Sequence, residues 1–68
     1  MKSSSKEVEI ECEVVAKTEK AWKVVTPTNL EGAWVPVSQI SDYCEEGNPA
    51  RVTSIFVTQW MAEQKGLV

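Results

Sequence analysis

Carboxylates alternate with apolar residues along the segment from Glu7 to Lys17. Successive side chains of a β-strand point to opposite faces, so this period of two predicts a strand with one apolar face and one acidic face. The residues expected to point inward are Val8, Ile10, Cys12, Val14 and Ala16. The residues expected to point outward are Glu7, Glu9, Glu11 and Glu13, each about 6.6 Å from the next. The rest of the chain must then supply strands that cover the apolar face.

The later segments predict further short strands separated by turns. β-Branched and aromatic residues are enriched in strands, and they favour strands over 21–26, 33–37 and 51–57. The three polar residues at 18–20 predict a hairpin between the first strand and the next one. Proline, asparagine and glycine predict a turn over 27–32 and a long loop over 41–50.

Proline and serine mark the end of the third expected strand. Pro36 has no backbone N–H, so it is expected at a sheet edge, at a bulge or at the end of that strand. Ser38 is expected to cap a single helical turn over 38–40.

The last ten residues predict a short helix. Thr58 stands where an N-cap is expected, and Gly66 stands where a C-terminal cap is expected. A helix this short is unstable alone, so it must dock on the sheet. Trp60 is the expected anchor of that docking, on a helix face shared with Gln64 and Leu67.

Together these segments predict one small, mainly β domain. Its 68 residues can bury only about 60% of their unfolded surface, so they build a single core. The domain is expected to span 7–68, after a Ser-rich, disordered tail over 1–6. We expect four or five antiparallel strands in an SH3-like barrel, or alternatively an OB-like barrel, closed by the C-terminal helix.

Composition excludes several classes of function. The net charge of −3 disfavours a general nucleic-acid binder, which needs a surplus of Lys and Arg. The absence of histidine removes the commonest general base and metal ligand, and Cys12 and Cys44 are too few for a structural zinc site. We therefore expect no catalytic residues, no metal and no cofactor. No apolar run reaches the roughly 20 residues of a membrane span, and we expect free thiols in a reducing cytoplasm.

Three segments together resemble a known group of proteins. They are Glu19-Lys20-Ala21-Trp22, then residues 33–40 (Ala-Trp-Val-Pro-Val-Ser-Gln-Ile), then residues 59–67 (Gln-Trp-Met-Ala-Glu-Gln-Lys-Gly-Leu). This order resembles small uncharacterised proteins and accessory domains encoded by bacteriophages and prophages, over residues 8–67. The resemblance implies a viral or prophage origin and a bacterial cytoplasmic setting. It supplies no catalytic residues that can be transferred to this chain, and it does not identify a ligand.

Two kinds of surface are candidates for binding. A protein partner would meet the acidic row and one exposed tryptophan, at Glu7, Glu9, Glu11, Glu13 and Trp34. The alternative is a single-stranded nucleic acid, stacked on aromatic rings beside cations at Lys20, Trp22, Lys23 and Trp34. A solvated strand face and core tryptophans remain open as the simpler interpretation of both sets. A homodimer is a further expectation, because a domain this small has to cover an exposed aromatic patch.

Two smaller groups of residues are interpreted as non-functional. Asp42, Glu45 and Glu46 are expected to be solvated in the long loop, because their spacing matches no calcium-binding loop. Cys44 has no evident cationic neighbour that would activate its thiol.

Overall fold

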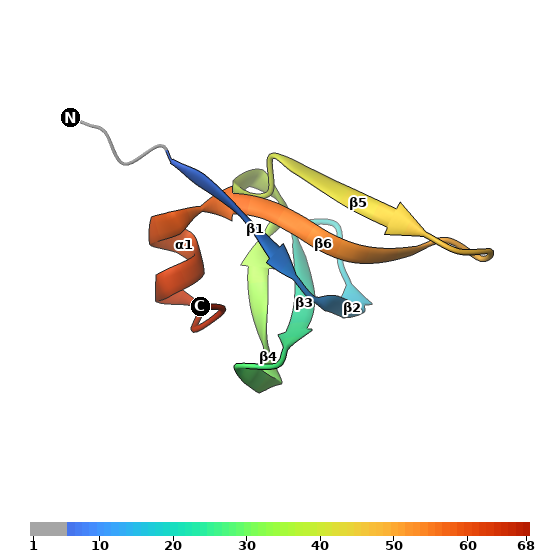
Figure 1. The fold of residues 1–68 in the computed structure, drawn as a ribbon, viewed down its shortest axis with the longest axis horizontal. Helices are drawn as coiled ribbons and strands as arrows, with labels where there is room; N and C mark the ends of the chain where they lie inside the picture. The colour runs from blue at the N-terminus through green and yellow to red at the C-terminus, as the bar shows by residue number, and fades with distance from the viewer. Residues whose placement is uncertain (1–5) are drawn as a thin grey trace.

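The computed structural model describes residues 6–68, and these form two antiparallel three-stranded sheets and a short C-terminal helix (Figure 1). The strand orders are β1-β6-β5 and β2-β3-β4. The elements are β1 (Glu7–Glu11), β2 (Glu13–Lys17), β3 (Ala21–Thr26), β4 (Asn29–Pro36), the 3₁₀ turn η1 (Val37–Gln39), β5 (Asp42–Glu46), β6 (Arg51–Thr58) and α1 (Gln59–Gln64). The mainly β class and the short C-terminal helix are confirmed. The described residues contain six strands, whereas four or five were predicted.

The first predicted strand is divided at Cys12. β1 pairs with β6, whereas β2 pairs with β3 in the other sheet. The backbone N–H of Cys12 donates to the carbonyl oxygen of Thr53 at 3.1 Å, so this residue still bonds to β6 while the chain passes between the sheets. The predicted alternation is confirmed through Val14, because Ile10 is buried, Val8, Cys12 and Val14 pack against the core, and the four glutamates are exposed. The prediction that Ala16 points inward is wrong, because a bulge at Val15 shifts the register and pairs Ala16 with Lys23 on the outer face. One continuous segment therefore joins the two sheets.

The core lies between the two sheets and the helix. Its largest fully buried side chains are Val24 of β3, Val35 of β4, and Ile55 and Val57 of β6. The helix and the residues after it add Met61, Ala62 and Leu67. Because β3 and β6 are the middle strands, each is paired on both sides, and together they supply three of these four residues.

Both predicted caps of α1 are confirmed. The Thr58 hydroxyl accepts a hydrogen bond from the backbone N–H of Met61 at 3.1 Å. At the other end, Gly66 has a φ of +69°, a conformation that glycine adopts without a steric penalty. The N–H of Leu67 donates to the carbonyl oxygen of Ala62 at 2.8 Å, and the N–H of Gly66 donates to the carbonyl oxygen of Glu63 at 3.2 Å. This pair of bonds is a Schellman motif, which turns the chain back toward the helix.

The prediction that Trp60 anchors the helix is wrong, because its side chain is 57% exposed. The helix is docked instead by Met61, Ala62 and Leu67, all of which are buried. The prediction placed Trp60 and Leu67 on the same helix face because it assumed that the helix continues beyond Lys65. The Schellman turn ends that spacing and returns Leu67 to the core beside Ala62.

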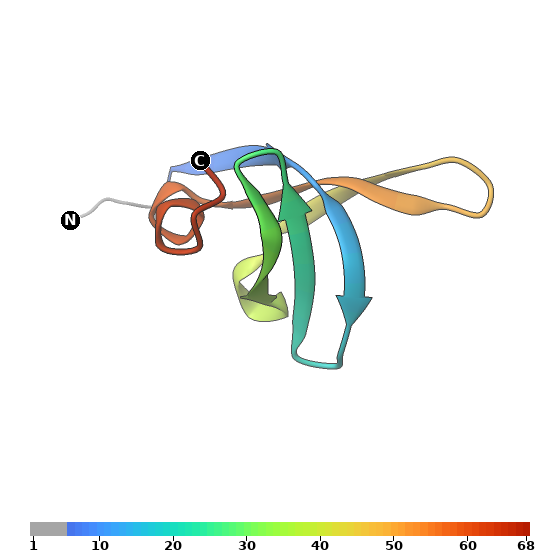
Figure 2. The ribbon, with the colours of Figure 1, turned by 90° about the horizontal axis from the view of Figure 1, so that it is seen from below.

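The long loop predicted over 41–50 is also wrong, because β5 occupies half of it. β5 pairs with β6 in a hairpin that projects beyond the β2-β3-β4 sheet (Figures 1 and 2). All five residues of β5 are exposed. Because none of them has to be buried, the sequence of β5 is as polar as that of a loop. A register shift between Cys44 and Glu45 leaves Thr53 of β6 without a directly opposite residue on β5.

The turn predicted over 27–32 is shorter than expected. It comprises Pro27 and Thr28, and β4 begins at Asn29. The Asn29 side chain accepts from the N–H of Gly32 at 3.1 Å and donates to the carbonyl of Lys65 at 3.0 Å. Gly32 has a φ of +93°, so the predicted turn formers create an irregular strand start that is tied to the end of α1.

Three smaller predictions concern the ends of elements. Pro36 is the last residue of β4, as predicted, but Ser38 makes no capping bond to η1. The tail was expected to extend to residue 6, yet the carbonyl of Lys6 accepts from the N–H of Gln59 at 2.9 Å. The rest of the predicted tail, residues 1–5, lies outside the described residues.

Candidate protein-binding surface

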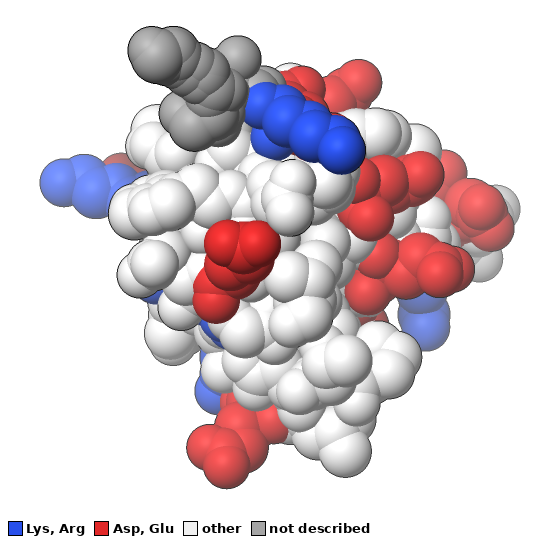
Figure 3. All heavy atoms as spheres, turned by 60° about the vertical axis from the view of Figure 1, so that its left-hand side comes forward, with Lys and Arg blue, Asp and Glu red and all other residues white. Residues whose placement is uncertain are grey.

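The acidic residues of β1 lie on the outer face of the β1-β6-β5 sheet. Glu9 is directly opposite Phe56 of β6, and Phe56 is in turn opposite Asp42 of β5. The Ser54 hydroxyl donates to a carboxylate oxygen of Glu9 at 2.7 Å, which fixes one member of the row. We call this surface the acidic face and define it by Glu7, Glu9, Glu11 and Asp42. Figure 3 shows acidic side chains gathered toward one side of the molecule, next to a wide area with few charges.

Trp34 lies on the other sheet and is not part of the acidic face. It is directly opposite Lys23 on β3, and its side chain is 44% exposed. Directly paired residues share a face of an antiparallel sheet, so Lys23 and Trp34 are neighbours. A methyl group at Gly32 would lie 2.9 Å from Cε of Lys23, which places the lysine stem against that glycine. We call this surface the Trp34 face and define it by Glu13, Lys23, Val25, Leu30 and Trp34. Glu13 is thus the one glutamate of the predicted protein-binding set that shares a face with Trp34.

The structure does not bring Trp22 together with Trp34. Trp22 is opposite Val35, which is fully buried, so its side chain points to the core side of the sheet. The Trp22 ring meets the Tyr43 ring edge-on at 5.2 Å, and Nζ of Lys17 lies 4.6 Å from the Trp22 centroid. Lys20 lies in the β2–β3 turn, where its carbonyl accepts from the N–H of Val37. The predicted nucleic-acid set is therefore spread over both sides of one sheet.

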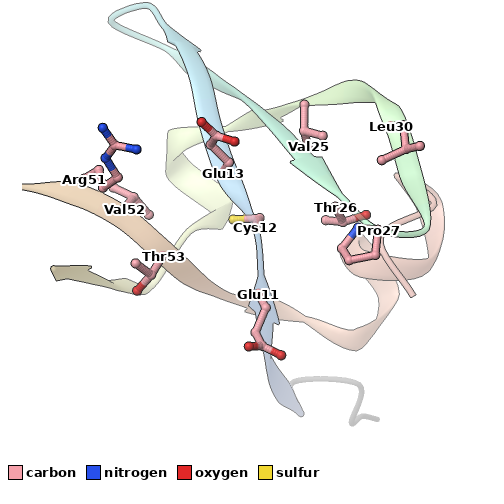
Figure 4. A pocket seen from close by; sticks show the side chains of 10 residues that line it. All are labelled: Glu11, Cys12, Glu13, Val25, Thr26, Pro27, Leu30, Arg51, Val52 and Thr53. Carbon is pink, nitrogen blue, oxygen red and sulfur yellow. The ribbon is translucent and has the colours of Figure 1, made fainter. Parts of the chain in front are cut away.

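An open groove of about 650 Å³ lies where β1 passes into β2 (Figure 4). The junction between β1 and β2, which carries Cys12, runs through the middle of the groove. The start of β6 lies on one side of it, and the β3–β4 turn lies on the other. The lining residues are Glu11, Cys12, Glu13, Val25, Thr26, Pro27, Leu30, Arg51, Val52 and Thr53. Glu13, Val25 and Leu30 also belong to the Trp34 face, so the groove is continuous with that face.

The apolar residues of this groove were missed by sequence reasoning. Leu30 falls in the segment predicted as a turn, yet it is 77% exposed on a strand. The spacing of Leu30 from Trp34 gave no usable signal, because the register shifts between Asn29 and Ala33. Val52 and Arg51 reach the groove because β6 is bonded to the β1–β2 junction through the Cys12 N–H and the Thr53 carbonyl, and no local pattern encodes that contact.

Partial burial in the groove changes the acidity of Cys12. Desolvation disfavours the thiolate and raises the pKa of the Cys12 thiol from 9.0 to about 11. The thiol is therefore neutral at physiological pH and acts as a small apolar surface. Cys12 and Cys44 are both free cysteines.

We expect Cys12 to be alkylated slowly in the folded chain. In a Cys44→Ser variant at pH 8, a pKa two units above 9.0 lowers the thiolate population about 100-fold. Iodoacetamide labelling followed by mass spectrometry should therefore be about 100-fold slower than labelling of the same variant in urea. The folded rate should rise with pH up to about 11. Equal rates in the folded and unfolded chains would contradict the assigned burial.

The described residues offer little support for other kinds of site. Within 6–68, no three His, Cys, Asp or Glu side chains are grouped so that they could hold a metal ion. Asp42, Glu45 and Glu46 lie on the exposed strand β5 rather than in a loop, and Cys44 is exposed beside them. In the same range, no helix has the length and apolar character needed to cross a bilayer.

Comparison with known proteins gives no relative from which a role can be transferred. No protein-family model matches the chain, and neither a curated protein nor a solved structure matches it.

Proposed function

We propose that this chain is a non-enzymatic protein-binding module that docks through the Trp34 face. The observation that carries the proposal is the exposure of two large apolar side chains on β4, Trp34 at 44% and Leu30 at 77%. Trp34 is opposite Lys23 of β3, and Leu30 lines the groove together with Val25 of the same strand. Tryptophan is enriched among the residues that dominate interface energies, and exposed apolar patches mark interaction sites. The partner is a protein, and the acidic face beside the groove favours one with a basic surface.

The proposed setting follows the resemblance to phage and prophage proteins. The chain would act in the bacterial cytoplasm as an accessory factor that occupies a surface of a host or phage protein. Inhibition of a host-defence protein is one such role. The small size and the acidic surplus support this proposal.

For the fold, we propose that the two sheets act as one SH3-like barrel, with an OB-like barrel as the alternative. The continuous passage from β1 to β2 supports this, because one segment belongs to both sheets. The edge-on contact between Trp22 of β3 and Tyr43 of β5 supports it as well, since it joins the two sheets on the core side.

Affinity capture with matched tryptophan variants tests the proposed function. Immobilised chain should retain a specific protein from bacterial extract, and Trp34→Ser should reduce its recovery about tenfold, as expected for an interface anchor. Trp60→Ser is the control, because it removes the same side chain from a more exposed position on α1. Circular dichroism must show that both variants remain folded. Equal recovery by the wild type and the Trp34→Ser variant would contradict the proposal.

A single-stranded nucleic acid is the second candidate ligand. The observation in its favour is the Lys23–Trp34 pair, which places a cation beside an exposed ring. Against it, Trp22 lies on the other side of the sheet and Glu13 shares the Trp34 face. We expect no quenching of tryptophan fluorescence by oligo(dT) or oligo(U) at low salt. Quenching that Trp34→Ser abolishes would favour the nucleic acid over a protein.

A homodimer through the Trp34 face is also part of the proposal. Sedimentation of the wild type and the Trp34→Ser variant tests it. A concentration-dependent dimer that this variant abolishes would identify the second copy as a partner.

A further inference from the structure

The groove at the β1–β2 junction has the dimensions of a binding site for a piece of chain. Its volume of about 650 Å³ lies in the range of ligand pockets, but it is open along the surface rather than enclosed. Its apolar lining comes from three separate segments of the chain: Cys12, Val25, Pro27, Leu30 and Val52. Such a lining offers contact area to a bulky aliphatic or aromatic side chain.

Hydrogen bonds hold the walls of the groove in place. On the floor, the N–H of Cys12 is bonded to Thr53 of β6 at 3.1 Å. In the wall beyond, the hydroxyls of Thr26 and Thr28 lie 3.1 Å apart, and Asn29 donates to the carbonyl of Lys65 at 3.0 Å. A preformed site loses little conformational freedom on binding, which favours affinity.

The charges around the groove favour a cationic occupant. Glu11 and Glu13 flank Cys12, and both side chains are exposed. Glu11 also continues the row of carboxylates on β1, so the groove opens directly onto the acidic face. Arg51 is the one cation among the lining residues, and it is paired across the strands with Glu46. Complementary charges steer a partner and set its orientation, so lysine or arginine is expected beside the seated side chain.

We infer that the groove binds a short segment of a partner protein in which a bulky apolar side chain is flanked by lysine or arginine. This rests on the proposed function, because it names the partner chemistry for a protein-binding module. The apolar side chain lies between Leu30 and Val52, and the flanking cations face Glu11 and Glu13. A second copy of this chain is the less complementary occupant, since each copy carries a net charge of −3.

Titration of the ¹⁵N-labelled full chain with three capped heptapeptides tests the inference. The first peptide has a central leucine, two lysines on each side and terminal glycines. The second replaces leucine with serine, and the third replaces the lysines with glutamates. The first should shift the amide signals of Cys12, Val25 and Leu30 saturably. The serine peptide should bind about tenfold more weakly, which corresponds to one lost apolar contact of about 1.4 kcal/mol. The glutamate peptide should cause no shifts.

Variants separate the groove from general attraction to an acidic protein. Leu30→Ser should weaken the leucine peptide about tenfold, and the Glu11→Gln, Glu13→Gln double variant should do so about fivefold or more. Glu19→Gln is the control, because it removes a carboxylate from the β2–β3 turn, outside the groove lining. Equal affinity for the leucine and serine peptides, an equal effect of the control variant, or no binding of the leucine peptide would each overturn the inference.

The peptide experiments can fail independently of the capture experiment that tests the proposed function. If the peptides fail while Trp34→Ser still abolishes capture of a protein, the groove inference is overturned and the docking face stands. If the captured protein is equally retained by Trp34→Ser and the peptides also fail, both are overturned. Dimerisation that Leu30→Ser abolishes would make a second copy the occupant and would overturn the proposed chemistry of the segment.

Discussion

Replacing Ile55 with alanine should lower the free energy of unfolding by about 2–5 kcal/mol. Ile55 is fully buried in the central strand β6, between Ile10 of β1 and Tyr43 of β5. The substitution removes buried methyl groups and leaves a cavity that the paired strands cannot close. At about 0.05–0.15 kcal/mol per residue, a chain of this length has roughly 3–10 kcal/mol in total. The substitution should therefore remove a large fraction of the total stability.

Urea denaturation followed by tryptophan fluorescence measures this loss. Val15→Ala is the matched control, because it also truncates an aliphatic strand residue, but Val15 is 52% exposed at the β2 bulge. A surface substitution of this kind should change stability by no more than about 0.5 kcal/mol. Similar losses in both variants would show that the core does not lie between the two sheets as described.

The helix should depend on Leu67 and not on Trp60. Leu67→Ala is expected to cost about 2–5 kcal/mol, because it empties a buried position that the Schellman turn holds beside Ala62. Trp60→Ala removes the larger side chain, yet most of that side chain is already in water. Its cost should stay below about 1 kcal/mol.

Thermal unfolding of the two variants distinguishes these expectations. The Leu67→Ala variant should melt well below the wild type, and the Trp60→Ala variant should melt close to it. If Trp60→Ala proved the more destabilising, the helix would be docked through the face that carries Trp60. Trp60→Ser would then be unsuitable as the control in the capture experiment.

Residues 7–17 show how far the sequence predicts the fold. The alternation of glutamate and apolar residues gave the strand, its two faces and the exposure of all four glutamates. It did not reveal the division at Cys12, because the period of two continues unbroken through that residue. Which sheet each half joins is decided by long-range pairing with β6 and β3, and no local signal encodes that choice.

Local composition was misleading where structure depends on hydrogen bonds rather than burial. β5 buries none of its residues and is held by backbone pairing to β6, so its sequence has the polarity of a loop. Asn29 and Gly32 are typical turn residues, but here they form the irregular start of β4. In both places the chain is ordered by bonds to distant strands.

The candidate site was predictable only in part. The exposure of the glutamates followed from the strand period, whereas the opposite orientations of Trp22 and Trp34 follow from the pairing of β3 with β4. Trp34 and the acidic face lie on different sheets, and this could be recognised only once the strand pairing of both sheets was known. The groove combines three segments that are distant in sequence, so no local spacing of residues predicts it.

The most direct test of the docking face is NMR of the chain bound to its captured partner, with the three indole N–H signals assigned. The indole signal of Trp34 and the methyl signals of Leu30 should shift or broaden on binding, while the signal of Trp60 stays in place. A shift confined to Trp60, with Trp34 and Leu30 unchanged, would contradict the proposal that this face binds the partner.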